Sequence, residues 1–284
     1  MTFSLPTAEI YVPDGRPAAE ALARTTHLAI GAHQDDLEIM AADGILQCFQ
    51  RDERGFTGVV VTDGAGSPRD GLYGRYTDEM MRTIRRLEQK KAAFVGDFSA
   101  AVLLDHPSAA IKDPRNTGPV DDLVALLEAT RPEVVYTHNL CDKHDTHVAV
   151  AWRVIAAIRR APAGARPARL YGCEVWRDLD WLVDGEKVAF DLSSHQNLQA
   201  ALVGVFDSQI SGGKRYDLAT WGRRKANATY AASHGTDQAE FVSYAMDLTP
   251  LVTDPGLDPA AYALAAVDRF REDVAARLAK FRPA

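Results

Sequence analysis

Short apolar runs alternate with segments of helical periodicity along the first two thirds of the chain. The apolar runs lie at residues 27–33, 57–62, 100–104, 133–137 and 169–176. The helical segments between them lie at residues 39–50, 77–94, 119–129 and 146–160. Strands that are apolar throughout and alternate with helices are typical of a mostly parallel sheet with both faces covered. The pattern therefore predicts an α/β fold with helices on both faces of the sheet.

The two ends of the chain depart from this alternation. Residues 1–26 contain three prolines, and we expect them to form an irregular N-terminal arm. Beyond a break at 163–168, helical periodicity returns at 194–208, 216–232 and 260–281. The last segment has four apolar side chains on or near one helix face: Leu264, Val267, Val274 and Leu278. We interpret residues 27–284 as one domain, with a core over 27–180 and a mixed α/β C-terminal elaboration over 181–284.

Composition and charge narrow the classes of protein. The 284 residues carry a formal net charge of −7 without a basic stripe, which argues against a nucleic-acid partner. Cys48, Cys141 and Cys173 are odd in number and far apart, so a disulfide framework is not expected. No segment has the length of a transmembrane helix or the pattern of a secretory leader, and we expect a cytoplasmic protein. The sequence is compatible with a homo-oligomer.

Two clusters of polar residues, at 32–38 and 139–147, each follow an apolar strand. Ligands bind beyond the carboxyl ends of parallel strands, so both clusters should lie at one edge of the sheet. His33 and Asp36 are three residues apart and can point at one centre. One further ligand from the neighbouring strand would complete a catalytic metal site with three protein ligands and an open position. Asp35 would point elsewhere, which suits a general base, and nearby cations should lower its pKa.

The second cluster offers two histidines at helical spacing, His144 and His147, beside Asp142 and Asp145. Asp142 could orient His144 through its second ring nitrogen. His138 ends a strand, and we interpret it as a core histidine. Helix capping is the structural alternative for the Asp35–Asp36 pair. Two histidines and a carboxylate also describe the facial triad of non-haem Fe(II) oxygenases, so the residues alone leave the metal open.

Both clusters resemble signatures of the PIG-L/LmbE-like deacetylase family. Residues 32–38 are similar to its Ala-His-Pro-Asp-Asp-Glu motif, and residues 139–147 to its Asn-x-x-Asp-x-His-Pro-Asp-His motif. Between them, residues 62–64 look like the family's Thr-Asp-Gly turn, and Arg85 with Glu88 looks like its Arg-x-x-Glu helix. The resemblance covers roughly residues 27–180, in the same order and spacing.

The resemblance implies a Rossmann-like fold and a zinc-dependent N-deacetylase acting on an N-acetylglucosamine-type small molecule or glycoconjugate. Carried over by position, the zinc ligands are His33, Asp36 and His147, with Fe²⁺ or another divalent metal as alternatives. Asp35 becomes the general base, and His144 the general acid or the group that stabilises the oxyanion. Further expected contacts to the substrate or to the ligands are Arg85, Asp63 and Asp142.

Several positions depart from the family's pattern. Gln34 replaces the usual proline, and Leu37 stands between the aspartate pair and Glu38. Asp145 and Thr146 replace a proline and an aspartate of the second motif, and their effect on the site stays open. All five expected ligand and catalytic positions are retained, so the sequence gives no reason to infer a loss of activity.

Weaker features lie mainly in the C-terminal part. The polar segment 222–237 contains His234, which could complete the substrate pocket, although a helix that ends at Gly235 explains it without function. The three tryptophans considered as a sugar platform or as core residues are Trp176, Trp181 and Trp221. Besides the N-deacetylase, two functions remain open. They are an amidase of the same fold with another N-acyl substrate, and a non-catalytic metal- or sugar-binding protein.

Overall fold

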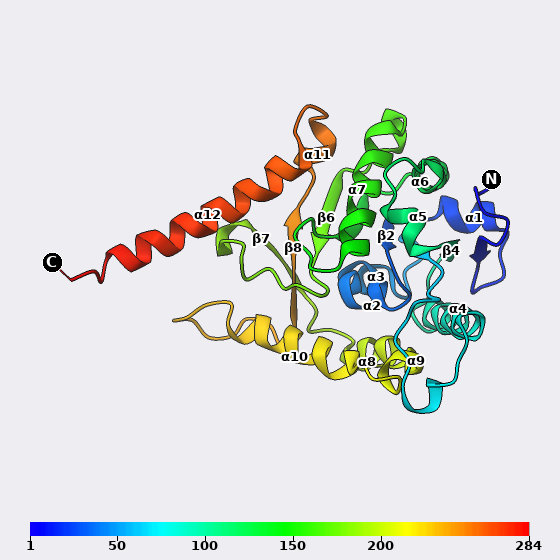
Figure 1. Cartoon of the computed structure of the whole chain (residues 1–284), viewed down its shortest axis with the longest axis horizontal. Coiled ribbons are helices and arrows are strands. Elements are labelled where there is room, and N and C mark those ends of the chain that lie inside the picture. The colour runs from blue at the N-terminus through cyan, green and yellow to red at the C-terminus, as the bar shows by residue number, and fades with distance from the viewer. Residues whose placement is uncertain (284) are drawn as a thin grey trace.

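A computed structural model describes residues 1–283 (Figure 1). The strands are β1 Glu9–Tyr11, β2 His27–Gly31, β3 Phe56–Thr62, β4 Ala100–His106, β5 Val134–His138, β6 Arg169–Cys173, β7 Lys187–Asp191 and β8 Val242–Asp247. The helices are α1 Ala18–Ala23, α2 Asp36–Met40, α3 Ala42–Cys48, α4 Asp78–Val95, α5 Ser108–Lys112, α6 Gly118–Thr130, α7 Asp145–Arg160, α8 Gln196–Gly204, α9 Asp207–Ile210, α10 Tyr216–Thr229, α11 Pro250–Thr253 and α12 Pro259–Ala279. All eight strands form one sheet in the order β1-β4-β3-β2-β5-β6-β8-β7.

The five central strands, β4 to β6 in the sheet order, are parallel, which confirms the predicted fold class. Their side chains alternate between two apolar cores because successive strand residues face opposite sides of the sheet. In β4, for example, Val102 packs into the core beneath α6 and α7, whereas Leu103 packs into the core on the side of α3, α4 and α8. Both faces of the sheet are therefore covered.

The sheet order reverses at β2, because the chain adds β3 and β4 on one side of it and β5 on the other. The chain therefore leaves the neighbouring strands β2 and β5 in opposite directions along the sheet. Such a position is a topological switch point, where open α/β sheets bind ligands. The cluster at 32–38 follows β2, and the cluster at 139–147 follows β5. The predicted convergence of the two clusters at one edge of the sheet is confirmed.

Two predictions about local structure are wrong. Residues 1–26 are not irregular throughout: β1 pairs antiparallel with β4, and α1 buries Ala21 and Leu22. The helix expected over 39–50 begins earlier and is broken into α2 and α3 at Ala41. The reason is a long-range contact, since Arg224 of α10 donates hydrogen bonds to the carbonyl oxygens of Glu38 and Ile39. A continuous helix would use these two carbonyls itself.

The C-terminal elaboration widens the sheet and adds a projecting helix. β8 inserts antiparallel between β6 and β7. Only the start of α12 is packed against the rest of the chain, and the helix then extends away from it (Figure 1). Its four predicted apolar side chains remain exposed, from 36% for Val267 to 69% for Leu278. None of the helices within residues 1–283 is both long and apolar enough to span a membrane.

Candidate active site

The turn between β2 and α2 supplies three acidic and imidazole side chains. A Cβ on Gly31 would lie 3.1 Å from that of Asp36, so glycine allows α2 to fold back against the end of β2. The backbone N–H of His33 donates to Asp36 Oδ2 at 2.6 Å and fixes this carboxylate. Asp35 has a φ of 97°, a conformation that favours glycine and that persists only where the surroundings enforce it. The turn therefore directs Asp35 and Asp36 differently.

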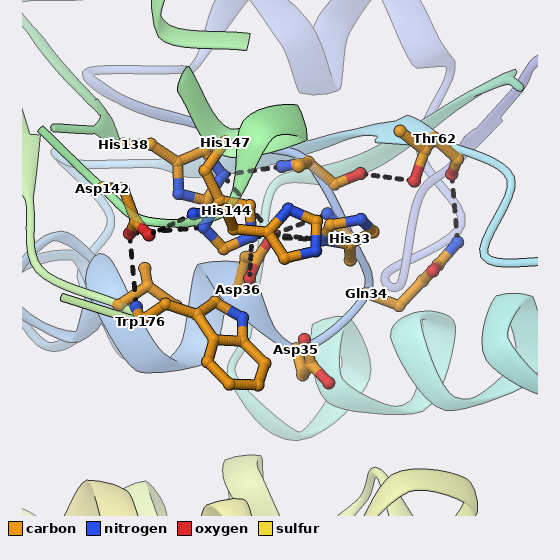
Figure 2. A network of polar contacts seen from close by, with 12 residues as sticks. His33, Gln34, Asp35, Asp36, Thr62, His138, Asp142, His144, His147 and Trp176 are labelled. Carbon is orange, nitrogen blue, oxygen red and sulfur yellow. Dashed lines mark hydrogen bonds and ion pairs between the residues drawn. The ribbon is translucent and has the colours of Figure 1, made fainter. Parts of the chain in front are cut away.

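Three side chains from β2–α2 and α7 place ligand atoms around one point (Figure 2). His33 Nδ1 lies 3.2 Å from His147 Nε2 and 3.3 Å from Asp36 Oδ2. His147 Nε2 lies 3.4 Å from Asp36 Oδ1. Zinc held at about 2.0–2.1 Å by tetrahedrally arranged ligand atoms sets those atoms roughly 3.3 Å apart. The donor types and their spacing fit a zinc-sized ion.

The protonation states of His147 and Asp36 also suit metal binding. Burial lowers the pKa of His147 to about 4, so its imidazole is neutral at neutral pH. Burial alone would raise the pKa of Asp36, but His147 and His138 hold it well below its ordinary value. A neutral imidazole and an ionised carboxylate are the forms that bind metal.

A second group of potential ligands, His138, Asp142 and His147, shares His147 with the first. In this group His138 Nε2 and the carboxylate of Asp142 already have partners. His138 Nε2 accepts a hydrogen bond from the backbone N–H of Ala32 at 2.9 Å. Asp142 lies 3.4 Å from His147 Nδ1 and accepts from the backbone N–H groups of His144 and Trp176. The group therefore orients His147 from behind, as carboxylates behind metal-bound histidines do.

This arrangement corrects the expected partner of Asp142. The sequence suggested that Asp142 orients the ring of His144, but its side chain contacts the ring of His147 and only the backbone of His144. The reason is that His144 precedes α7, whereas His147 lies in its first turn. The His144 ring stacks on His147 with centroids 4.5 Å apart, and its Nδ1 is buried without a partner.

Asp35 is held by a chain of charged contacts that reaches the C-terminal part. Arg85 of α4 lies 3.1 Å from Asp35 Oδ2 and also donates to the carbonyl of Gln34. Its other terminal nitrogen lies 3.6 Å from Glu88, which accepts two hydrogen bonds of 2.7 Å from Ser208. Arg85 is 1% exposed, so this contact is shielded from solvent. Arg85 therefore fixes the orientation of Asp35.

Without a bound ion, the pKa of Asp35 shifts in the direction opposite to the one expected. Burial raises its pKa to about 6, and the Asp36 carboxylate adds to the effect, while Arg85 and His33 oppose it. For His144, burial lowers the pKa and the neighbouring His33 lowers it further. The environment thus brings the carboxyl group of Asp35 toward the pKa range of a general base that works near neutral pH.

A pocket of about 490 Å³ opens beside the three potential ligands. It is lined by His33, Asp35, Asp36, Ile39, Gly64, Gly66, Ser67, Pro68, Arg85, Ser108, Lys112, His144, Thr146, Val175, Trp176, Gln209, Lys214 and Tyr216. His147 lies behind this surface and is fully buried. The volume is that of a small-molecule site. The pocket unites ligand, base and acid candidates from both sequence clusters.

Other predicted residues lie outside this pocket. Asp63 accepts a hydrogen bond from the backbone of Ala65 and shapes the turn after β3, without lining the pocket. His234 is exposed in the segment that follows α10, whereas Tyr216, at the other end of this helix, lines the pocket. Fourteen helical residues span about 21 Å, which separates His234 from the site.

The three tryptophans do not form a platform. Trp176 lines the pocket, with the ammonium group of Lys214 above its ring at 4.9 Å from the centroid. Trp221 packs perpendicular to Phe241 in the core, with ring centroids 4.4 Å apart. Trp181 packs against the core on the opposite face of the sheet. Only Trp176 is placed to contact a substrate.

Sequence reasoning missed the residues that support α2 from outside the two clusters. Arg224 is 2% exposed and donates to the α2 carbonyls and to Gln199. Gln89 of α4 donates to the buried carboxyl group of Glu38 at 2.8 Å. The sequence marked Arg224 only as part of the polar segment 222–237. Periodicity alone could not predict that this segment packs against α2.

Comparisons with known proteins agree with this geometry. Residues 28–158 match the family model described as PIG-L: GlcNAc-PI de-N-acetylase. No curated protein matches the sequence.

Several solved structures share the fold. N,N'-diacetylchitobiose deacetylase from Pyrococcus horikoshii has 15% identity and a TM-score of 0.62, covering 80% of this chain and 85% of that one. A conserved protein from Thermus thermophilus has 18% identity and a TM-score of 0.60, covering 82% and 99%. The 4-carboxy-2-hydroxymuconate hydratase GalB from Pseudomonas putida has 16% identity and a TM-score of 0.57, covering 79% and 96%. A deacetylase and a hydratase share this fold, so the fold alone does not determine the reaction.

Proposed function

We propose that this chain, whose residues 28–158 match the PIG-L family model, is a metal-dependent N-deacetylase. The observation that carries the proposal is the cluster of His33, Asp36 and His147 beside a pocket also lined by Asp35. The two histidine nitrogens lie 3.2 Å apart, and each lies 3.3 to 3.4 Å from one oxygen of the Asp36 carboxylate. A hydrolase needs both a metal cradle and a nearby base. We propose zinc as the metal and an N-acetylglucosamine-type compound as the substrate.

Each residue has a separate role in the proposed reaction. His33, Asp36 and His147 would hold the metal, which when bound would polarise the amide carbonyl and activate water for attack. Asp35 takes a proton from the attacking water, because it lines the pocket and Arg85 contacts only its Oδ2. His144 lies on the pocket wall and donates a hydrogen bond to the developing oxyanion.

The leaving amine needs a proton before the C–N bond breaks. Asp35 carries the proton taken from water and can return it to this nitrogen, so a single carboxyl group serves as base and then as acid. The contact with Arg85 keeps this group in one orientation through both transfers. The products are acetate and the free amine.

The proposal is tested by elemental analysis of the purified protein and an acetate-release assay on N-acetyl sugars and other N-acyl amines. We expect one zinc per chain and release of acetate from an N-acetylglucosamine derivative. Faster hydrolysis of another N-acyl group would favour an amidase of the same fold. The zinc-loaded protein hydrolysing no compound of a broad amide panel would contradict the proposal.

The variant Asp35→Asn tests the role of the general base independently of metal binding. We expect kcat/KM to fall by about 10²–10⁴-fold, the usual contribution of a general base, while zinc content stays at one per chain. The matched control is Asp78→Asn, on an exposed carboxylate at the start of α4, which should leave both values unchanged. Retained activity in Asp35→Asn would remove Asp35 from the proposed mechanism.

A further inference from the structure

The exposed apolar side chains of α12 follow a heptad spacing. Six residues, alternately three and four positions apart, occupy the a and d positions of this repeat: Leu264, Val267, Arg271, Val274, Leu278 and Phe281. We call them the α12 stripe; Phe281 lies in the turn that ends the helix. The five apolar members are between 36% and 84% exposed. Two helices of a coiled coil pack along a narrow seam of this kind.

The stripe lies on a free side of α12. The contacts of this helix with the rest of the chain are made near its start, where Ala263 and Ala266 are buried and Arg269 pairs with Glu186. At 3.6 residues per turn, these positions lie roughly a third of a turn around the helix from the stripe. The helix then extends away from the sheet (Figure 1), and none of its described residues from 270 onward is buried. The described chain therefore leaves the stripe uncovered.

The stripe is complementary to itself when two copies of α12 run antiparallel. In such a pair, the a positions of one helix face the d positions of the other. The stripe begins with an a position and ends with a d position, so every member finds a partner. The pairs, each joining one copy to the other, are Leu264–Phe281, Val267–Leu278 and Arg271–Val274. Each pair occurs twice, which is the self-matching that a two-fold axis requires.

Arg271 favours the antiparallel over the parallel direction. In a parallel pair, the two copies of Arg271 would face each other at one a layer, where like charges repel. In the antiparallel pair, each faces Val274 of the second copy. Arg271 lies 3.6 Å from Asp268 of its own helix, so its charge stays at the edge of the stripe while its apolar stem covers the valine.

The charges at the two ends of α12 agree with this direction. Lys280 and Arg282 follow its last turn, whereas Asp254 and Asp258 precede its first. Antiparallel packing places the basic end of each copy beside the acidic end of the other. It also brings the positive end of each helix dipole near the negative end of its partner.

We propose that two copies of this chain associate through α12, as an antiparallel two-helix coiled coil about a two-fold axis. The inference goes beyond the proposed function and does not depend on it, because no residue of α12 lines the catalytic pocket. The contact spans only about 26 Å along the helix and contains a charge at one a position, which costs stability. The association is therefore weak and reversible, with a Kd on the order of 50 µM.

A second copy fits the stripe better than a lipid surface does. Helices that lie on a membrane have a broad apolar face and a polar face rich in lysine and arginine. The α12 stripe is only two of every seven positions wide. Asp268 and Glu272 lie directly beside it, and their charges would be repelled by anionic headgroups.

Sedimentation velocity of the full chain measures the association. Between about 5 and 300 µM, we expect the average mass to rise from that of one chain toward that of two. Leu278→Glu, on a residue that is 69% exposed, should keep the protein monomeric throughout, because it places a carboxylate in two of the layers. The matched control is Ala276→Glu, which adds the same charge at an exposed position outside the stripe and should associate as the unmutated protein does.

Arg271→Leu tests the stripe in the opposite direction. It replaces the charged member by an apolar one, so the association should become at least 10-fold tighter, because a polar residue at an a position costs stability. Circular dichroism and the melting temperature establish that each variant is folded.

Cysteine cross-linking with oxidised glutathione tests the direction of the pair. Val267→Cys combined with Leu278→Cys should give a disulfide between copies, since these positions face each other. Leu278→Cys alone should not, because its two copies would lie eleven residues or about 16 Å apart along the helix, beyond the roughly 7 Å limit for a disulfide. The unmutated protein, with its own three cysteines, is the control. Cross-linking of Leu278→Cys alone would overturn the antiparallel direction.

Three further results would overturn the proposal. The first is a single-chain mass over the whole concentration range. The second is an association that Leu278→Glu leaves unchanged. The third is binding to phosphatidylglycerol vesicles that Leu278→Glu abolishes, without association in solution, which would assign the stripe to a lipid surface. Acetate release should be the same in Leu278→Glu and in the unmutated protein, so these results are independent of the proposed N-deacetylase function.

Discussion

At the scale of single residues, His147 is the point where two histidine–carboxylate groups meet. Its Nε2 faces His33 and Asp36, and its Nδ1 faces Asp142. A metal could in principle bind on either side of this ring. The Nε2 side is favoured because His33 and Asp36 line the pocket, whereas His138 and Asp142 are buried and do not line it.

Metal content distinguishes the two sides. We expect His33→Ala to lose the zinc, because the remaining pair of ligands cannot complete the site. His138→Gln should keep one zinc per chain, because glutamine can still accept the backbone hydrogen bond. The variant should be less stable, because glutamine packs less well than the imidazole, which stacks on His147 with ring centroids 3.8 Å apart. Elemental analysis after dialysis measures both. The reverse pattern, metal lost only in His138→Gln, would place the ion on the Nδ1 side.

The residue types of the site could be predicted from the sequence, but their pairing could not. His33 and Asp36 were expected ligands from their spacing after one strand, and His147 was expected from the family resemblance; the structure brings the three together. The partner of Asp142 depends on where α7 begins, and the raised pKa of Asp35 depends on burial by distant elements. Neither property is local in the sequence.

At the scale of elements, one carboxylate fastens the N-terminal segment to the sheet. Asp122 of α6 accepts hydrogen bonds from the backbone and the hydroxyl group of Ser4, at 2.7 and 2.6 Å, and it lies 2.9 Å from His106 Nε2 at the end of β4. Burial alone would raise the pKa of Asp122, but the contacts with His106 and Ser4 hold it below its ordinary value.

A pH-dependent loss of stability follows from this lowered pKa. Asp122→Asn should lower the free energy of unfolding at pH 7 by about 1.5–3 kcal/mol, the range for a hydrogen bond to a charged group. A lowered pKa means that the ionised form stabilises the fold above about pH 4 and that this contribution is lost as the pH falls further. The difference between Asp122→Asn and the unmutated protein in urea unfolding should therefore shrink below about pH 4.

The adjacent residue provides the matched control. Asp121 pairs with Arg160 at the surface, where its side chain is 51% exposed, and exposed ion pairs contribute only about 0–1 kcal/mol. We expect Asp121→Asn to change stability little at any pH. An equal effect of both substitutions would contradict the anchoring role of Asp122.

Helices and strands that depend on local sequence patterns were predicted correctly, whereas those that depend on contacts distant in the sequence were not. The central strands were predicted because each is a continuous apolar run, and α4 because its helical periodicity spans residues 77–94; the side chain of Thr77 caps this helix. β1, β7 and β8 were not predicted, since they are edge or antiparallel strands whose place depends on distant partners. The break between α2 and α3 arises from Arg224, which no local pattern reveals.

At the scale of the whole molecule, the distal half of α12 contributes little to the folded chain. Ala263 and Ala266 are buried, but the described residues from Arg271 onward are not. Deleting residues 271–284 should therefore lower the free energy of unfolding by less than about 1 kcal/mol, which corresponds to roughly 2–4 °C or less in Tm. Differential scanning calorimetry measures this change.

The control for this deletion is Ala266→Asp, which places a charge in a fully buried position and should destabilise by about 2 kcal/mol or more. A large effect of the deletion would mean that another surface covers the exposed apolar face of α12. Dependence of that effect on protein concentration would support the homo-oligomer with which the sequence is compatible.

Because α2 depends on residues distant in the sequence, the part of the chain that contains the ligands should not fold on its own. All three expected ligands lie within 28–158, yet Ser208 and Arg224, which support their surroundings, lie outside it. A fragment with residues 28–158 would contain every ligand without being an autonomous folding unit. We expect it to aggregate when expressed alone and to recover zinc binding only when co-expressed with residues 159–284, by fragment complementation.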